Sequence, residues 1–139
     1  MTNTKQHINP DGTRITVPIS TTIGDNVTIG NGVKLGVGIS IQDDVRIDDN
    51  VTIGYHSTIG ASTVIEDDVS VSSRVTINEE ARLFTQARIA DQVTIGCNVE
   101  VGERTFVGMK VQIPDYWMIK SDKIVNAGNE TVGFLPQIH

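Results

Sequence analysis

The sequence predicts an all-β, single-domain parallel β-helix of about six coils. A branched aliphatic residue recurs at every sixth position from Val17 to Ile119 without a miss. This period fits neither an α-helix nor a single strand, but it fits a prism in which each hexad forms one short wall and one tight corner. Eighteen hexads, three to a coil, give six coils. The series is Val17, Ile23, Ile29, Leu35, Ile41, Ile47, Ile53, Ile59, Ile65, Val71, Ile77, Leu83, Ile89, Ile95, Val101, Val107, Ile113 and Ile119.

A second series of smaller residues lies four places after each member of the first. Nine of its 17 members are Val, and most of the others are Ala, Ser or Thr. Both series are expected to point inward, with residues 18 apart stacked on one another. One such column is Ile at every level, which favours the stack because identical β-branched side chains pack well in register. Its members are Ile23, Ile41, Ile59, Ile77, Ile95 and Ile113, and we expect Ile41, Ile59 and Ile77 to be buried.

The residues between the walls are typical of tight turns. Gly follows the large aliphatic residue in eight hexads, and the next two positions favour Asp, Asn and Gly. Within the repeat, Pro occurs only at Pro18 and Pro114, where a missing N–H does least harm to a strand ladder. No hexad contains an inserted residue, so the coils are expected to follow one another without an excursion.

Residues 1–16 are predicted to form an N-terminal cap before the repeat domain, residues 17–119. Asn9–Gly12 has the composition of a turn, and the chain after it alternates into the first wall. A cap is needed because the open end of a β-helix presents unpaired backbone groups that recruit other chains.

Residues 120–139 are predicted to form a C-terminal cap. Lys123–Val125 and Thr131–Leu135 flank the turn-like segment Asn126–Glu130, and this pattern predicts a short hairpin.

Composition narrows the classes of function. The chain has 139 residues and a net charge of −6, which argues against a nucleic-acid partner because such a surface needs clustered Lys and Arg. The opening MTNTKQHINPDG has no apolar run, so neither a signal peptide nor a membrane span is expected, and the chain is predicted to be cytoplasmic. The single Cys97 has no partner for an internal disulfide and is expected at an exposed corner.

Units such as TIGDNV-TIGNGV, TIGYHS-TIGAST and TIGCNV-EVGERT resemble the hexapeptide-repeat family, whose fold is a left-handed parallel β-helix. That family includes acetyl- and acyltransferases, zinc carbonic anhydrases and members without catalysis. The resemblance implies left-handedness and a homotrimer with active sites between neighbouring prisms. It also implies transfer of an acyl group to a small hydroxyl or amine acceptor. Acetyl-CoA or another acyl thioester would serve as co-substrate, with no covalently bound cofactor.

The three corners of the prism differ in charge. The first corner carries Asp25-Asn26, Asp43-Asp44, Ala61-Ser62, Glu79-Glu80 and Cys97-Asn98, and the second carries Asn31-Gly32, Asp49-Asn50, Asp67-Asp68, Thr85-Gln86 and Glu103-Arg104. The third carries Val37-Gly38, Tyr55-His56, Ser73-Arg74, Asp91-Gln92 and Met109-Lys110. The first two corners are acidic and solvated in character, whereas the third is mixed, aromatic and cationic. The third corner is therefore the candidate subunit interface and site.

His56 is the candidate general base on this corner, with Tyr55 beside it and Arg74 one coil further on. An imidazole can take a proton from an acceptor hydroxyl or amine near neutral pH, which is the role that the resemblance implies. Tyr55 and Arg74 are the candidate substrate-binding residues, because a guanidinium can hold a carboxylate or phosphate. A polar surface corner with no ligand is the alternative interpretation of the same residues.

Three departures from the family pattern favour a non-catalytic structural or interaction protein as the alternative function. No loop extends from a coil, and the Trp-Ile-Gly context of acetyltransferase sites is absent near His56. The Pro-containing coil around Pro114 is similar to that of family acetyltransferases, but Asn126–Glu130 replaces the Gly-Asn-Pro-Ala-Lys-like element that follows it there.

Other ligands fit the sequence less well. Zinc is not expected, because the chain has only His7, His56 and His139, and two of them lie in the caps. Stacked carboxylates could attract calcium, although such a run is more often a solvated face. A column of Thr and Ser on one wall suggests ice binding, but the Thr-x-Thr spacing of that class is missing, and a hydroxyl ladder also stabilises stacked strands.

Overall fold

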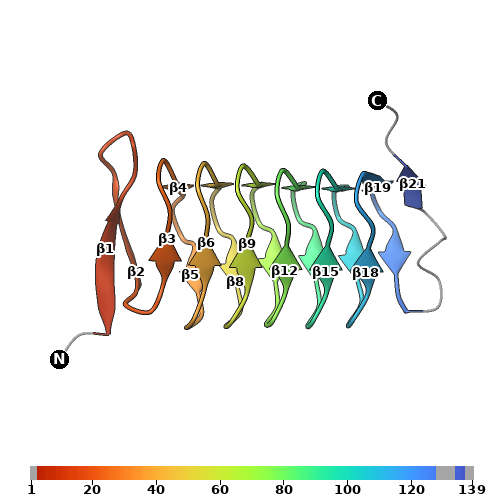
Figure 1. Ribbon diagram of the computed structural model, residues 1–139, viewed down its shortest axis with the longest axis horizontal. Helices are drawn as coiled ribbons and strands as arrows, with labels where there is room; N and C mark the ends of the chain where they lie inside the picture. Colours follow the sequence, from red (N-terminus) through yellow and green to blue (C-terminus); the bar gives the residue numbers. More distant parts are fainter. Residues whose placement is uncertain (1–2, 128–133, 137–139) are drawn as a thin grey trace.

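The computed structural model describes residues 3–127 and the backbone of residues 134–136. The described chain forms a β-hairpin followed by a regular coil of short parallel strands, drawn end to end in Figure 1. No helix capable of crossing a membrane occurs in these residues.

The coil has three walls, each a sheet of short parallel strands that lie far apart in sequence, and one further strand at the end of wall 2 runs antiparallel. Wall 1 contains β3 (Thr22–Ile23), β6 (Ser40–Ile41), β9 (Thr58–Ile59), β12 (Thr76–Ile77), β15 (Thr94–Ile95) and β18 (Gln112–Ile113). Wall 2 contains β4 (Thr28–Ile29), β7 (Arg46–Ile47), β10 (Val64–Ile65), β13 (Arg82–Leu83), β16 (Glu100–Val101), β19 (Trp117–Ile119) and β21 (Phe134–Pro136). Wall 3 contains β5 (Lys34–Leu35), β8 (Thr52–Ile53), β11 (Ser70–Val71), β14 (Arg88–Ile89), β17 (Phe106–Val107) and β20 (Ile124–Val125).

The strand register confirms the predicted stacking. Ile41 pairs with Ile59 and Ile59 with Ile77, each 18 residues on, and the same step recurs in all three walls. The predicted all-β parallel β-helix of about six coils is therefore confirmed as a β-solenoid.

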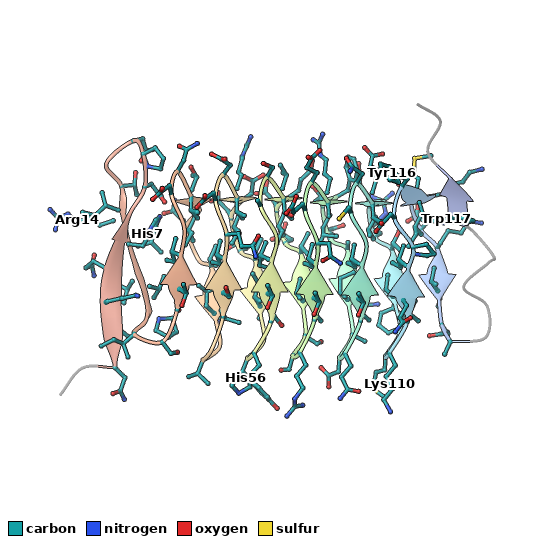
Figure 2. All side chains as sticks on the ribbon, viewed as in Figure 1. His7, Arg14, His56, Lys110, Tyr116 and Trp117 are labelled. Atoms are coloured by element: carbon teal, nitrogen blue, oxygen red, sulfur yellow. The ribbon has the colours of Figure 1, made fainter. Side chains whose placement is uncertain are left out.

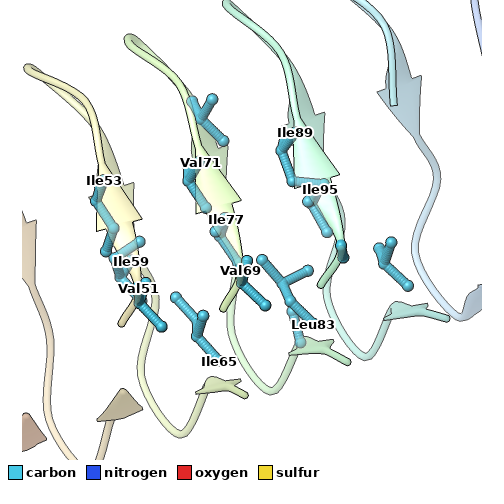
Figure 3. Packing of buried hydrophobic residues seen from close by; sticks show 14 of the residues in the cluster. Val51, Ile53, Ile59, Ile65, Val69, Val71, Ile77, Leu83, Ile89 and Ile95 are labelled. Carbon is cyan, nitrogen blue, oxygen red and sulfur yellow. The ribbon is translucent and has the colours of Figure 1, made fainter. Parts of the chain in front are cut away.

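The core is a column of aliphatic side chains inside the prism, and Figure 3 shows its middle coils. Ile41, Ile59 and Ile77 are at most 1% exposed, as predicted. The other members of both series are buried as well, apart from four that lie near the ends of the coil and are only partly buried. These four are Ile23, Val33, Leu35 and Trp117. Burial falls toward the ends because a terminal coil has a neighbour on one side only.

Four hydroxyl groups are buried among the inward positions. Ser57, Thr63 and Thr105 each donate a hydrogen bond to the backbone carbonyl 15 residues later, over 3.1, 3.1 and 3.0 Å. Thr21 Oγ1 is also buried, yet it has no hydrogen-bond partner. An unsatisfied buried hydroxyl costs free energy that a satisfied one does not.

Replacing Thr21 by Val is therefore expected to raise the free energy of unfolding by about 1 kcal/mol. Thr63→Val is the matched control, because it removes a hydroxyl that donates to the Asn78 carbonyl, and it is expected to lower that free energy by about the same amount. Urea denaturation followed by circular dichroism measures both. Equal losses in the two variants would contradict the prediction.

The corners place a residue in the left-handed backbone region once per hexad. From Asn26 to Asp122, the third residue after each large aliphatic has φ between +57° and +74°. Most of these residues are not Gly, although side chains are disfavoured there. The Gly that follows the aliphatic residue has a different role: a Cβ on Gly60 would lie 2.6 Å from the carbonyl carbon of Asn78 in the next coil.

The N-terminal hairpin closes one end of wall 2. β1 (Thr4–Ile8) and β2 (Arg14–Pro18) pair in antiparallel fashion around a turn in which the Gly12 N–H donates to the Asn9 carbonyl. The Asn9 side chain donates to the Ile29 carbonyl and accepts from the Ile29 N–H, each over 2.8 Å. His7 donates from Nε2 to the Val27 carbonyl over 2.9 Å. The side-chain amide of Asn9 thus makes the two hydrogen bonds to β4 that a further neighbouring strand would otherwise make.

The C-terminal end differs from the predicted hairpin. β20 (Ile124–Val125) pairs in parallel with β17 and continues wall 3. β21 (Phe134–Pro136) pairs in antiparallel fashion with β19, so the predicted pairing of Lys123–Val125 with Thr131–Leu135 is wrong where the strands are described. Ile124 stays in the 18-residue register of Phe106, which extends the parallel ladder by one more strand. Residues 128–133, which include most of the predicted turn Asn126–Glu130, lie outside the described residues.

Candidate functional site

His56 lies at the third corner, in the turn after β8 (Thr52–Ile53), with φ at +60°. Its backbone N–H donates to the Val37 carbonyl over 2.9 Å, which fixes the turn to the preceding coil. The ring packs over Gly38: a Cβ on that glycine would lie 2.5 Å from His56 Nδ1. Gly38 therefore provides the space that the imidazole occupies, and its own φ of +74° also favours Gly.

The structure brings the three predicted site residues together. The rings of Tyr55 and His56 lie edge to face, with centroids 5.6 Å apart and planes at 88°. The guanidinium carbon of Arg74 lies 5.5 Å from the centre of the Tyr55 ring, within the range of a cation–π contact. The backbone N–H of Arg74 donates to the backbone carbonyl of Tyr55 over 2.9 Å, because the two residues occupy successive coils of the same corner.

The polar atoms of this group are available to a ligand. Within residues 3–127, no carboxylate lies within ion-pair distance of Arg74, and no hydrogen bond occupies a ring nitrogen of His56. Both side chains are exposed, and Figure 2 shows His56 and Lys110 projecting from the same long edge of the prism. The imidazole of His56 can accept a proton and the guanidinium of Arg74 can hold an anion. The two side chains lie on a convex edge, which by itself does not enclose a ligand.

Three hollows on the described surface lie away from His56. One of about 180 Å³ lies over wall 2 between Phe84 and Lys120, where Gly102 leaves a gap in a row of side chains. Another, of about 420 Å³, lies between the hairpin and the first corner, beside His7 and Asp25. A third, of about 320 Å³, lies over wall 1 beside Thr22 and Gln42. His56 lines none of these three hollows.

Aspartates on all three corners have a structural role that the sequence interpretation missed. Aspartates at the first position of a corner accept a hydrogen bond from the backbone N–H 18 residues earlier, over 2.7–3.0 Å. These are Asp43, Asp49, Asp67, Asp91 and Asp115. The 18-residue spacing was the available signal in the sequence, because it places each carboxylate one coil beyond a turn N–H that the strand ladder leaves free.

One ion pair at the second corner links successive coils in the same way. Arg104 Nε donates to Asp122 Oδ1 over 2.7 Å, and this hydrogen bond holds the pKa of the Asp122 carboxyl below its ordinary value. The same contact raises the pKa of Arg104. The guanidinium of Arg104 is therefore paired with a carboxylate of its own chain, whereas that of Arg74 has no such partner among the described residues.

Metal ligands do not gather in the described part of the chain. No group of three or more His, Cys, Asp and Glu side chains there is arranged to hold a metal ion. His7 is committed to the cap, Cys97 is half-buried at the first corner rather than exposed, and His139 lies outside the described residues.

Comparison with known proteins identifies the repeat by a family model and the fold by solved structures. The family model for the bacterial transferase hexapeptide, six repeats, matches residues 26–61. No curated protein sequence matches the chain.

Two solved structures are similar in fold at low identity. UDP-N-acetylglucosamine O-acyltransferase from Moraxella catarrhalis aligns over 78% of this chain with a TM-score of 0.59 and 19% identity. The acetyltransferase domain of PglB from Neisseria gonorrhoeae, in complex with acetyl coenzyme A, aligns over 73% with a TM-score of 0.55 and 14% identity. The chain spans 59% and 57% of the length of these two proteins. The resemblance to hexapeptide-repeat proteins is thus confirmed in the repeat itself and in the β-helix that the repeat builds.

Proposed function

We propose that the protein is an acyltransferase of the hexapeptide-repeat type that acts as a homotrimer in the cytoplasm. It moves an acyl group from a thioester donor, such as acetyl-CoA, to a small hydroxyl or amine acceptor. His56 is the general base that takes the acceptor proton, and Tyr55 and Arg74 bind substrate.

The observation that carries this proposal is the grouping of Tyr55, His56 and Arg74 on one corner, with no hydrogen bond or ion pair to their side-chain polar atoms among the described residues. Attack on a thioester requires removal of the acceptor's proton, for which a free imidazole is suited. Phosphate groups of a coenzyme A donor require cations, and the guanidinium of Arg74 has no competing carboxylate among the described residues. The similar fold of an O-acyltransferase and of an acetyltransferase domain solved with acetyl coenzyme A supports this class of chemistry.

Isothermal titration calorimetry with acetyl-CoA tests the proposal. We expect saturable binding at micromolar to millimolar ligand, and binding weakened at least about tenfold in Arg74→Ala, because a charge-assisted contact contributes on the order of 1.5–3 kcal/mol. Lys34→Ala, which removes an exposed cation from wall 3, is the matched control and should leave the affinity unchanged. Acyl-carrier-protein donors need a parallel titration. No binding of either donor class at millimolar concentration would favour the second function.

The second candidate function is a non-catalytic structural or interaction protein. The uninterrupted 18-residue register favours it, because no loop leaves the described coils to cover a substrate. The edge formed by the third corner would then serve as a docking surface for a protein rather than as a catalytic site.

A further inference from the structure

The chain contains a single Asn-Gly pair, Asn31-Gly32. It forms the second corner of the first coil, between β4 and β5, and both residues are exposed. Gly32 has φ +73° and no Cβ, so its backbone nitrogen is the least obstructed that can follow an Asn side chain. The pair therefore has the local chemistry of a deamidation site, and Asn is among the thermolabile residues of proteins.

The backbone N–H of Gly32 lacks the hydrogen bond that holds its counterparts. In each later coil, the N–H of the second residue of this corner donates to the carbonyl of the first residue one coil earlier. Asn50 donates in this way to Asn31 over 2.8 Å, and Asp68 donates to Asp49 over 3.0 Å. The hairpin replaces the coil that would precede Gly32, and within residues 3–127 the Gly32 N–H makes no hydrogen bond.

The side chain of Asn31 is free for the same reason. Asp49 and Asp67 occupy its position in the next two coils, and they accept from the N–H groups of Asn31 and Asp49 over 2.9 and 3.0 Å. The corresponding donor for Asn31 is the N–H of Thr13, which instead donates to Asp11 Oδ1 over 2.9 Å. Among the described residues the Asn31 amide has no hydrogen-bond partner.

Other sites of related chemistry are protected. Three corner asparagines each precede a Val that is at most 1% exposed, and these are Asn26, Asn50 and Asn98. The Asp-Gly pair of the hairpin turn is held at both reacting groups. The Gly12 N–H donates to the Asn9 carbonyl over 2.9 Å. The hydrogen bond from Thr13 lowers the pKa of the Asp11 carboxyl, which keeps it ionised and a poor target for attack.

We propose that Asn31-Gly32 is a site of spontaneous modification at which the folded protein deamidates to a mixture of aspartate and isoaspartate. The Gly32 nitrogen loses its proton to a base in solution and bonds to Cγ of Asn31. The Cγ–Nδ2 bond breaks, and ammonia leaves with a proton returned by water. Water then opens the cyclic imide: attack at Cγ gives aspartate, and attack at the main-chain carbonyl carbon gives isoaspartate. Water is the only co-reactant.

The products change the first coil and leave the later coils as they are. Either product adds a negative charge to the column that holds Asp49 and Asp67. Isoaspartate also lengthens the main chain by one CH2 group and turns the carbonyl that accepts from Asn50 into a free carboxylate. Val33 and Leu35, which follow the corner, are only partly buried, so the longer corner is accommodated in a folded molecule.

A matched pair of sites tests the proposal. Asp49→Asn combined with Asn50→Gly introduces a second Asn-Gly pair one coil further on, where φ of +60° suits Gly and the N–H donates to the Asn31 carbonyl. The folded variant and wild type are incubated at mildly alkaline pH, and peptide mass spectrometry measures conversion at each site. We expect Asn31 to react at least about fivefold faster than the introduced pair, because the hydrogen bond must open before that nitrogen can attack. In urea the two pairs should react at equal rates.

Isoelectric focusing follows the added charge, and labelled methylation by an isoaspartyl methyltransferase, measured on separated peptides, counts isoaspartate. Asn31→Gln should abolish both signals. Circular dichroism shows that each sample stays folded. An Asn31 that reacts in urea but persists in the folded wild type overturns the proposal, as does an acidic shift that survives in Asn31→Gln. Equal rates at the two Asn-Gly pairs of the folded variant, or faster isoaspartate formation at Asp11-Gly12, overturns the assignment to a free N–H in the first coil.

Discussion

His56→Ala is expected to lower acyl transfer roughly 10²–10⁴-fold, because removing a general base forces the acceptor to lose its proton to water. The melting temperature should change little, since the side chain is exposed and its ring contacts only Gly38 and the likewise exposed ring of Tyr55. Turnover with saturating donor and acceptor measures the effect. Full activity in His56→Ala would contradict the assignment of His56 as the general base.

His56→Asn separates the role of the imidazole from that of the turn. Asn adopts the left-handed backbone region more readily than Ala, so it should preserve the φ of +60° while providing no base. Both variants should therefore be equally inactive. Gln92→Ala, on the same corner two coils further on and with φ +62°, is the control that should retain wild-type turnover. If Gln92→Ala is as damaging as His56→Ala, the corner acts through assembly rather than through a proton transfer.

Asn9→Ala is expected to lower the free energy of unfolding by about 2–4 kcal/mol, since it leaves the N–H and the carbonyl of Ile29 without partners at a buried position. Asn9 is 5% exposed, and its two bonds to Ile29 are both 2.8 Å long. Guanidinium denaturation measures the loss. We also expect more aggregation, because the uncovered β4 edge can pair with another chain.

Asn9→Asp tests the same contact with almost the same shape. The carboxylate can accept from the Ile29 N–H but has no proton to donate to the Ile29 carbonyl, so two oxygens face each other. The free energy of unfolding lost in Asn9→Asp should match or exceed that lost in Asn9→Ala. Gln6→Ala is the control within the hairpin, because it removes only an exposed bond to Thr16, and a loss as large as that of Asn9→Ala would contradict the capping role.

The repeat made the body of this protein readable from sequence. A period of six places each large aliphatic on the inner side of a wall, and each coil repeats the environment of the last, so local residues are sufficient to define the register. Ile59 is buried and stacked between Ile41 and Ile77 as predicted. The positions of the turns could be predicted for the same reason, although only the structure showed which residue of each corner has the positive φ.

The candidate site was readable in part. The 18-residue step predicts that Arg74 follows Tyr55 on one corner, but the cation–π contact and the packing of His56 over Gly38 depend on side-chain orientation. The role of the corner aspartates depended on orientation too, because a carboxylate on a surface turn can face solvent or the N–H of the previous coil.

The ends were decided by tertiary structure alone. Asn9 reaches Ile29 across 20 residues that share no period with it, and no local pattern marks a side chain that replaces a strand. At the other end, β21 returns to β19, while β20 adds a parallel strand to wall 3. A repeating sequence specifies its own continuation, whereas the place where repetition stops depends on contacts between residues far apart in the chain, and only the folded molecule brings them together.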